Sequence, residues 1–226
     1  MYTVKELFST LQGEGAHAGR AAVFCRFAGC NLWSGREVDR ASAVCRFCDT
    51  DFVGTDGAGG GKFTSATDLA TVIESAWRSA GAGSHHRYVV FTGGEPLLQL
   101  DAALIEAMHA LQFEVAIETN GTIPVPQGVD WVCVSPKAGS DLVVLQADEI
   151  KLVIPQDGHE SLEDILKRFE GMDYRHRYLQ AMDGPLQAEN IALAIRLCQK
   201  SPLWSLIVQT HKLIGIRLTL YLVQRY

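Results

Sequence analysis

Three cysteines fall within one short segment of the chain, and their thiols are candidate metal ligands. Cys30, Cys45 and Cys48 are spaced as C-x14-C-x2-C. Structural zinc is held by four ligands, and neither Cys25, in the middle of an expected strand, nor His17 is well spaced to be the fourth. The other common partner of several thiolates is an iron–sulfur cluster. A [4Fe–4S] cube held by only three cysteines keeps one iron free to bind another molecule.

A second motif gives that free iron a role. "FTGGEP" at 91–96 ends an apolar run and resembles the GGE motif of the radical S-adenosylmethionine superfamily, in which the open iron chelates the methionine moiety of S-adenosylmethionine. Glycine lets the backbone approach a ligand closely, and the resemblance implies that Gly94 and Glu95 meet the methionine end. The superfamily's usual spacing is C-x3-C-x2-C, so the cysteine loop here is expanded. A plain turn before a helix is the alternative interpretation of this motif.

Further segments narrow the resemblance to one family, the 7-carboxy-7-deazaguanine synthases. Across about residues 5–216 the chain carries, in the family's order, "LQGEG", a loop closing in "CDT", "TGGEP", "ETNGT", "SPK", "QAMDG" and "QTHKLIGI". The resemblance implies a carbon–nitrogen lyase that converts 6-carboxy-5,6,7,8-tetrahydropterin to 7-carboxy-7-deazaguanine with release of ammonia, in queuosine and 7-deazapurine biosynthesis. It also implies a 5′-deoxyadenosyl radical that takes a hydrogen from C6 of the pterin and later returns it.

The same resemblance assigns three cofactors to residues of this chain. The implied ligands of the [4Fe–4S] cluster are Cys30, Cys45 and Cys48. Magnesium, which is usually held by few protein groups, is implied at Thr50, a residue that the sequence alone would place in a turn. The residues implied to bind S-adenosyl-L-methionine are Phe47, Cys48, Asp49, Gly94, Glu95, Ser135, Pro136, Lys137, Gln180, Ala181, Met182 and Asp183.

Substrate contacts are implied mainly by segments near the amino terminus. We expect the guanidinium of Arg26 to bind the pterin carboxylate and Glu14 to accept from the aminopyrimidine N–H groups. Glu118 and His211 are the candidate acid and base; a capping role for Glu118 and a structural role for His211, on the last predicted strand, are the alternatives. The implied substrate-binding set is Leu11, Gln12, Gly13, Glu14, Arg26, Thr92 and Arg217.

Positioning these groups requires strands that alternate with helices. Short apolar runs predict strands at 21–29, 87–94, 113–121, 131–137, 149–155, 177–184 and 203–212. Helices are expected at about 65–81, 101–111, 161–170 and 188–200, the first with Ser65 and Asp68 as an approximate capping box. No helix is expected between the strands at 113–121 and 131–137. The pattern predicts an α/β fold: an incomplete parallel (β/α) barrel of the radical S-adenosylmethionine type, with six or seven strands.

Such a barrel carries its functional groups at the carboxyl ends of its strands. Cys30 and the segments 93–96, 118–120, 135–137 and 180–183 all lie where a predicted strand ends. We therefore expect the residues implied by the resemblance to meet at one edge of the sheet.

We expect one radical S-adenosylmethionine domain over residues 1–226, with an insertion and a tail. The cluster-loop insertion at 31–44 is expected to form a lid or a small helix near the cluster. Family members tend to stop soon after "HKLIGI", with the terminal residue near the substrate, whereas "RLTLYLVQRY" continues here through 217–226. Arg217 then takes the place of that terminal residue without a free carboxylate.

Composition narrows the class of protein and its partners. An apolar fraction of 47% and a charged fraction of 20% over 226 residues are typical of a soluble globular chain. The net charge of −6 and the absence of long basic runs argue against a nucleic-acid partner. The sequence shows neither a secretory signal nor a run of about 18 apolar residues, so we expect a cytoplasmic protein with no membrane partner. We also expect an electron donor such as flavodoxin or ferredoxin, and a homodimer, because an open sheet has an unprotected edge.

Two other functions stay open at the level of the sequence. A radical S-adenosylmethionine activating enzyme, which acts on a protein glycine, would share the cysteines and the GGEP motif but has less need of Arg26, Glu14 or magnesium. A non-enzymatic binding module stabilised by zinc at Cys45 and Cys48 would be colourless and would not respond to S-adenosylmethionine.

Overall fold

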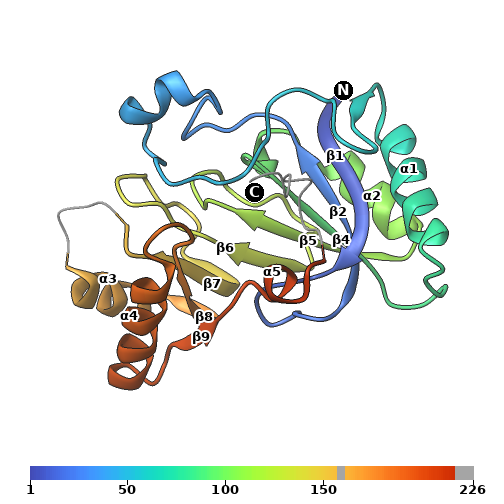
Figure 1. Cartoon of the computed structure of the whole chain (residues 1–226). Coiled ribbons are helices and arrows are strands. Elements are labelled where there is room, and N and C mark those ends of the chain that lie inside the picture. Colours follow the sequence, from blue (N-terminus) through green and yellow to red (C-terminus); the bar gives the residue numbers. More distant parts are fainter. Residues whose placement is uncertain (157–160, 217–226) are drawn as a thin grey trace.

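A curved sheet of nine strands dominates the computed structural model, which describes residues 1–156 and 161–216 (Figure 1). The strand order is β3-β1-β2-β4-β5-β6-β7-β8-β9, and β3 and β9 are its two edges. From β2 to β9, seven neighbouring strands run parallel, whereas β1 pairs antiparallel with both β2 and β3. The predicted incomplete parallel barrel is therefore confirmed.

The strands are β1 (Tyr2–Leu11), β2 (Ala21–Phe27), β3 (Gly61–Phe63), β4 (Arg87–Gly93), β5 (Phe113–Thr119), β6 (Trp131–Val134), β7 (Gln146–Ile154), β8 (Asp173–Ala181) and β9 (Ser205–Ile207). The α-helices are α1 (Ala66–Ser79), α2 (Ala102–Ala110), α3 (Leu162–Glu170), α4 (Gln187–Lys200) and α5 (Thr210–Ile214). Two short 3₁₀ helices are η1 (Glu37–Ser42) and η2 (Pro96–Leu98).

Most predicted elements are confirmed, and the differences have local causes. β1 was not predicted because Lys5 and Glu6 interrupt its apolar pattern; both side chains are nevertheless buried and ion-paired. The predicted last strand through residue 212 is wrong. Only Ser205–Ile207 pair with β8, after which the amide of Thr210 donates to the carbonyl of Gly13 and the chain turns into α5.

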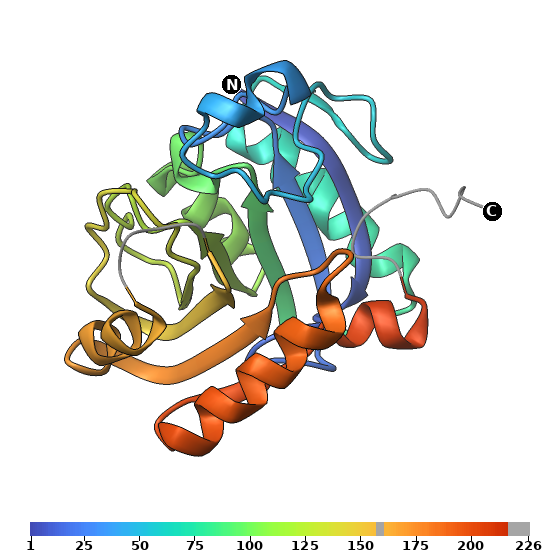
Figure 2. The same cartoon turned by 60° about the vertical axis from the view of Figure 1, so that its left-hand side comes forward.

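Helices cover the outer face of the sheet in two separate groups. Ser65 is the N-cap of α1 and forms the predicted capping box with Asp68. Together with α2, α1 packs over β1, β2, β4 and β5 in one apolar core. α3 and α4 pack over β7 and β8 in a second core, and Figure 2 shows the two groups on either side of the curved sheet. As predicted, no helix connects β5 to β6.

The insertion between the first cysteine and the C-x2-C pair contains the short 3₁₀ helix η1. Figures 1 and 2 show this segment over the edge at which the arrows of the parallel strands end. Cys25 and Cys133 are buried within strands, as expected for small apolar side chains. Across the described residues, none of the helices has both the length and the apolar character needed to cross a membrane.

Candidate functional site

A cavity of about 240 Å³ opens at the carboxyl ends of the parallel strands, against the cysteine loop. Residues from the amino-terminal loop, the cysteine loop, α5 and the strands β2, β4, β5, β6, β7 and β8 or the segments directly after them meet there. The predicted site residues that line it are Glu14, Arg26, Cys30, Cys45, Phe47, Cys48, Asp49, Thr50, Thr92, Gly94, Glu118, Ser135, Lys137, Gln180, Met182, Asp183 and His211. The fold thus brings together residues spread from position 14 to position 211.

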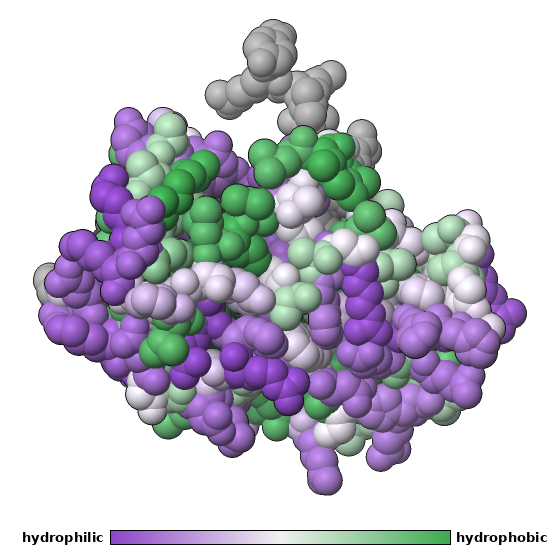
Figure 3. Space-filling view, turned by 90° about the horizontal axis from the view of Figure 1, so that it is seen from below, coloured by the Kyte–Doolittle hydropathy of each residue, from purple (hydrophilic) through white to green (hydrophobic). Residues whose placement is uncertain are grey.

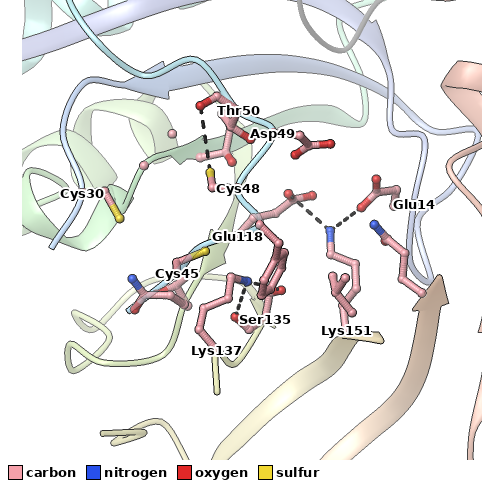
Figure 4. Close-up of a pocket in the computed structure, with 18 of the residues that line it drawn as sticks. Glu14, Cys30, Cys45, Cys48, Asp49, Thr50, Glu118, Ser135, Lys137 and Lys151 are labelled. Atoms are coloured by element: carbon pink, nitrogen blue, oxygen red, sulfur yellow. Dashed lines mark hydrogen bonds and ion pairs between the residues drawn. The ribbon is translucent and has the colours of Figure 1, made fainter. Parts of the chain in front are cut away.

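The three cysteines of the motif face one side of this cavity (Figure 4). The amide of Leu32 lies 3.4 Å from Sγ of Cys30, and burial raises the pKa of that thiol. The thiol of Cys45 hydrogen-bonds to Cys48, which lowers the pKa of Cys48 and raises that of Cys45. Of the three thiols, Cys48 is therefore the one most readily converted to the thiolate that binds iron.

This donor set fits an iron–sulfur cluster. Cysteine thiolates are the ligands by which proteins hold such clusters, and three cysteine thiols line this one cavity.

The backbone of Gly94 in the GGEP motif lies very close to Gly29 and Cys30. A Cβ added at Gly94 would lie 2.2 Å from the carbonyl oxygen of Gly29 and 2.6 Å from Cβ of Cys30. Only glycine permits this approach, and the amide of Glu95 donates to the same carbonyl of Gly29 at 3.0 Å. The motif therefore fixes the backbone from which Cys30 projects.

The carboxylate of Glu95 faces the protein interior rather than the cavity. It accepts from Oγ1 of Thr119 at 2.8 Å and from the amides of Asn120 and Leu97 at 2.8 and 3.0 Å. Burial raises the pKa of Glu95, although these hydrogen bonds oppose the rise. In this structure Glu95 joins the end of β4 to the end of β5 and does not line the cavity.

Lys137 presents a cation at the cavity beside the cysteines. Its Nζ donates to the carbonyl oxygen and to Oγ of Ser135, both at 2.7 Å, and lies 5.8 Å from the ring centroid of Phe47. Burial lowers the pKa of this ammonium. Since its described partners are neutral, Lys137 is suited to bind an anionic ligand.

Three charged side chains, the buried Glu14 and Lys151 and the half-buried Glu118, form a group across the cavity from the cysteines (Figure 4). Nζ of Lys151 contacts Oε2 of Glu14 and lies 3.5 Å from Oε2 of Glu118. Burial alone would lower the pKa of Lys151, but the two carboxylates outweigh it and hold that pKa well above its usual value. Lys151 in turn outweighs the burial of Glu14 and lowers its pKa.

Neutral side chains complete the coordination of these carboxylates. Nε2 of Gln12 donates to Oε1 of Glu118 at 3.1 Å, and Nε2 of Gln209 donates to Oε1 of Glu14 at 2.8 Å. His211 lies beside them on α5 rather than on a strand, so its predicted placement is wrong although it does line the cavity. Burial lowers the pKa of His211.

Two buried polar atoms in the cavity wall have no hydrogen-bond partner within the described part of the chain. They are Oε1 of Gln180 and Nδ1 of His211. Because unpaired buried polar atoms are costly, these positions are where a bound ligand would complete the structure.

Several predicted site residues lie outside the cavity wall. Leu11 pairs with Ala21 at the start of β2, at the opposite end of that strand from Cys30, and is half-exposed. A Cβ at Gly13 would lie 2.3 Å from Nδ1 of His211, so Gly13 supports α5. The other predicted residues that do not line the cavity are Gln12, Glu95, Ala181 and Pro136, the last of which lines a separate cavity near α3. Arg217 lies outside the described residues.

Several residues that line this site were not in the predicted set, and three of them carry charged or amide side chains that contact predicted site residues. These three are Lys151, Gln209 and Lys212. The signal for Lys151 was present: Glu149 and Lys151 alternate within the apolar run "EIKLVIP", so both face the barrel interior. Lys212 pairs with Asp49 and Asp183 and so joins α5 to the cysteine loop and to the end of β8.

Comparisons with known proteins agree with this geometry. The family model of the radical SAM superfamily matches residues 40–183. A 7-carboxy-7-deazaguanine synthase of Bradyrhizobium diazoefficiens is 60% identical over 96% of this chain and 99% of its own length. The enzyme of the same name from Bordetella pertussis is 59% identical over 95% and 99%. The crystal structure of QueE from Escherichia coli superposes with a TM-score of 0.66 at 27% identity, covering 93% of this chain and 94% of that one.

Proposed function

The chain belongs to the 7-carboxy-7-deazaguanine synthase family of the radical SAM superfamily, and on that premise we propose how its residues divide the work of the reaction. The reaction is the radical-mediated ring contraction of 6-carboxy-5,6,7,8-tetrahydropterin to 7-carboxy-7-deazaguanine with release of ammonia, in queuosine and 7-deazapurine biosynthesis. We place it among the carbon–nitrogen lyases. The observation that carries the assignment of residues is that the three thiols and the Glu14–Lys151–Glu118 group open onto one cavity.

Cys30, Cys45 and Cys48 hold the [4Fe–4S] cluster. When bound, the cluster and S-adenosylmethionine supply a 5′-deoxyadenosyl radical for abstraction of a hydrogen atom from the substrate. On the protein side, the backbone at Gly94 sets the position of Cys30, and Lys137 provides a cation for the carboxylate of the methionine moiety. Oε1 of Gln180, which has no hydrogen-bond partner among the described residues, is available as an acceptor in the same cavity.

Glu14 and Glu118 receive the pterin. The two carboxylates, which are bridged by the ammonium of Lys151, offer acceptor oxygens to the N–H groups of an aminopyrimidine ring. Arg26, fixed by a 2.8 Å bond from Nε to Oε1 of Glu6, supplies positive charge in the same wall for the substrate carboxylate. Glu118, with Lys151 at Oε2 and Gln12 at Oε1, is placed to accept a proton.

His211 is the second candidate for proton transfer. The lowered pKa keeps its imidazole neutral at neutral pH. Because Nδ1 has no partner among the described residues, the ring can accept or donate one hydrogen bond. Its position on α5, beside Gly13, sets it against the substrate side of the cavity.

Magnesium is the third proposed cofactor, with Thr50 as its protein ligand. Thr50 lines the cavity directly after Cys48 and Asp49. A single protein oxygen plus substrate carboxylate oxygens is a usual environment for this ion. There it would neutralise the carboxylate and favour loss of the C7 proton in the last step.

The remaining proposals concern partners and compartment. We expect flavodoxin or ferredoxin as the electron donor and the cytoplasm as the compartment, because thiols that must stay reduced need a reducing environment. We also propose a homodimer. β9 is an open edge strand, and exposed apolar side chains lie along it and α5, at Leu206, Val208, Leu213 and Ile214. Figure 3 shows apolar patches among polar ones on one face of the molecule.

Anaerobic turnover of the reconstituted protein tests the proposal. The assay contains 6-carboxytetrahydropterin, S-adenosylmethionine, dithionite and magnesium, and product is followed by absorbance and mass. We expect 7-carboxy-7-deazaguanine without net loss of S-adenosylmethionine. Reductive cleavage of S-adenosylmethionine with no pterin product would contradict the substrate assignment. Activity that survives Cys30→Ala would contradict the cluster ligands.

A further inference from the structure

Arg40 ties the insertion at 31–44 to the backbone of the C-x2-C pair. Its Nη1 donates to the carbonyl oxygen of Arg46 at 2.8 Å and to that of Cys48 at 3.0 Å. These carbonyls belong to the middle and the end of the turn that carries both cysteines. One side chain from the insertion therefore holds the turn at two points.

The guanidinium is itself held from two further sides. Its Cζ lies 4.1 Å from the ring centroid of Trp33, and its Nε donates to both carboxylate oxygens of Glu37, at 2.9 and 2.8 Å. The planar guanidinium can stack and donate several bonds at once, whereas a lysine ammonium cannot keep this geometry. The position of Arg40 is thus determined by its surroundings.

Trp33 anchors this arrangement to the body of the protein. The indole is buried and packs edge-on against Phe52, with ring centroids 5.5 Å apart. Its Nε1 donates to the carbonyl oxygen of Arg36 at 3.2 Å. A Cβ at Gly35 would collide with Val53 and Phe52, which shows how closely the insertion packs here. The insertion is therefore a packed unit with its own aromatic contact.

The same unit reaches the first cysteine. The carbonyl oxygen of Leu32 accepts from the amides of Val44 and Cys45, at 3.1 and 3.3 Å. The amide of Leu32 contacts Sγ of Cys30 at 3.4 Å. Contacts of the insertion thus link all three cysteine positions.

We propose that Arg40 is a positioning residue for the iron–sulfur cluster. Its guanidinium fixes the C-x2-C turn so that Cys45 and Cys48 are presented together with Cys30. Ligands held in place before binding lose less conformational freedom when the cluster forms. The proposal rests on the proposed set of cluster ligands and extends it to a residue that does not touch the cluster.

Substitutions of Arg40 and of a matched arginine test this. Arg40→Lys keeps the positive charge but loses the planar guanidinium, and Arg40→Met loses both the charge and the guanidinium. Arg36→Met is the control, because Arg36 lies in the same insertion, is 69% exposed and pairs with Asp39 instead of the cysteine turn. In the reconstituted proteins we would measure the rate of iron loss to a chelator and the electron paramagnetic resonance (EPR) spectrum of the reduced cluster, with and without S-adenosylmethionine. In the apoproteins we would measure the thermal midpoint.

We expect both Arg40 variants to lose iron at least about tenfold faster, because each loses the two charge-assisted hydrogen bonds to the cysteine turn, and to show a changed EPR spectrum. Arg36→Met should match the unsubstituted protein. Iron loss and spectra that are unchanged in both Arg40 variants would overturn the proposal. So would a lower apoprotein midpoint with unchanged iron loss, because Arg40 would then stabilise only the insertion. A full cluster in Cys48→Ala would instead refute the ligand set, independently of Arg40.

Discussion

Lys151 on β7 and Glu118 on β5 face each other inside the half-barrel, with Nζ 3.5 Å from Oε2, although β6 separates their strands. The same ammonium contacts Glu14, so one cation serves two carboxylates, one buried and one half-buried. Neither carboxylate has another described lysine or arginine within ion-pairing distance. The charge state of this part of the cavity therefore depends on Lys151.

Lys151→Met should impair both folding and turnover. Removing one partner of a buried ion pair costs about 3 kcal/mol of unfolding free energy, and turnover should fall because Glu14 and Glu118 repel each other without their shared cation. Denaturant unfolding and steady-state kinetics with the pterin measure the two effects. Lys5→Met is the control: Lys5 is as buried but pairs with Asp51 and Asp56 outside the cavity, so it should change stability more than the KM for substrate. Equal effects of both variants on KM would contradict the role given to Lys151.

Glu95→Gln should destabilise the protein before any cofactor is added. Its carboxylate accepts three hydrogen bonds, from Thr119, Asn120 and Leu97, and an amide NH₂ cannot accept. We expect a loss of about 1–3 kcal/mol in the apoprotein, measured by urea unfolding. If the apoprotein keeps its stability and only the affinity for S-adenosylmethionine falls, the direct contact with the cofactor predicted from the motif is correct instead.

Gly94→Ala should reduce cluster content because the new methyl group would displace Cys30. The added Cβ would lie 2.6 Å from Cβ of Cys30 and 2.2 Å from a backbone oxygen that cannot move freely. Iron and sulfide analysis after reconstitution, with the absorbance of the cluster, gives the readout. Gly83→Ala is the matched substitution, since a Cβ there meets nothing within 4 Å. Equal iron content in the two variants would show that the close approach is not needed.

Thr50→Val should weaken the response to magnesium, whereas Thr50→Ser, which keeps the hydroxyl, should not. We expect the magnesium concentration for half-maximal turnover to rise at least about tenfold, the lower limit of the loss seen when even an outer partner of a metal is removed. Magnesium titrations of turnover measure this. Identical titration curves for the valine and serine variants would remove the Thr50 side chain from the proposed ligands.

Stability should fall with acid partly through His211. Burial lowers its pKa below the usual 6.5, so as pH drops through about 6.5 the unfolded chain takes up a proton that the folded protein does not. The stabilisation is present above pH 6.5 and is lost as pH falls toward the lowered value. His211→Gln should therefore show a smaller drop in thermal midpoint between pH 7 and pH 5.5. The exposed His85→Gln serves for comparison, and an unchanged drop in His211→Gln would contradict the buried neutral imidazole.

The sequence predicted the parallel strands and the helices because the spacing of their apolar residues is visible within each segment, without knowledge of the fold. These patterns did not predict the charged side chains that are buried. Lys5, Glu6 and Lys151 are buried as ion pairs with residues far away in the chain, and no local pattern reveals such partners. His211 was assigned to a strand because "LWSLIVQTHK" is β-prone throughout, whereas a contact between Thr210 and Gly13 ends the strand. The inward direction of Glu95 depends on Thr119 and Asn120, which only the fold brings to it.

The lack of a helix between β5 and β6 divides the outer layer into two apolar cores, and the cavity crosses the line between them. Cys30 and Thr92 belong to the first half of the sheet, and Lys151 and Gln180 belong to the second. When no ligand is bound, we expect the amide protons of the two halves to exchange at different rates. Ligands that bind across the cavity stabilise only the state in which both halves are folded. Binding of cofactor and substrate should therefore slow amide exchange in both halves of the sheet together.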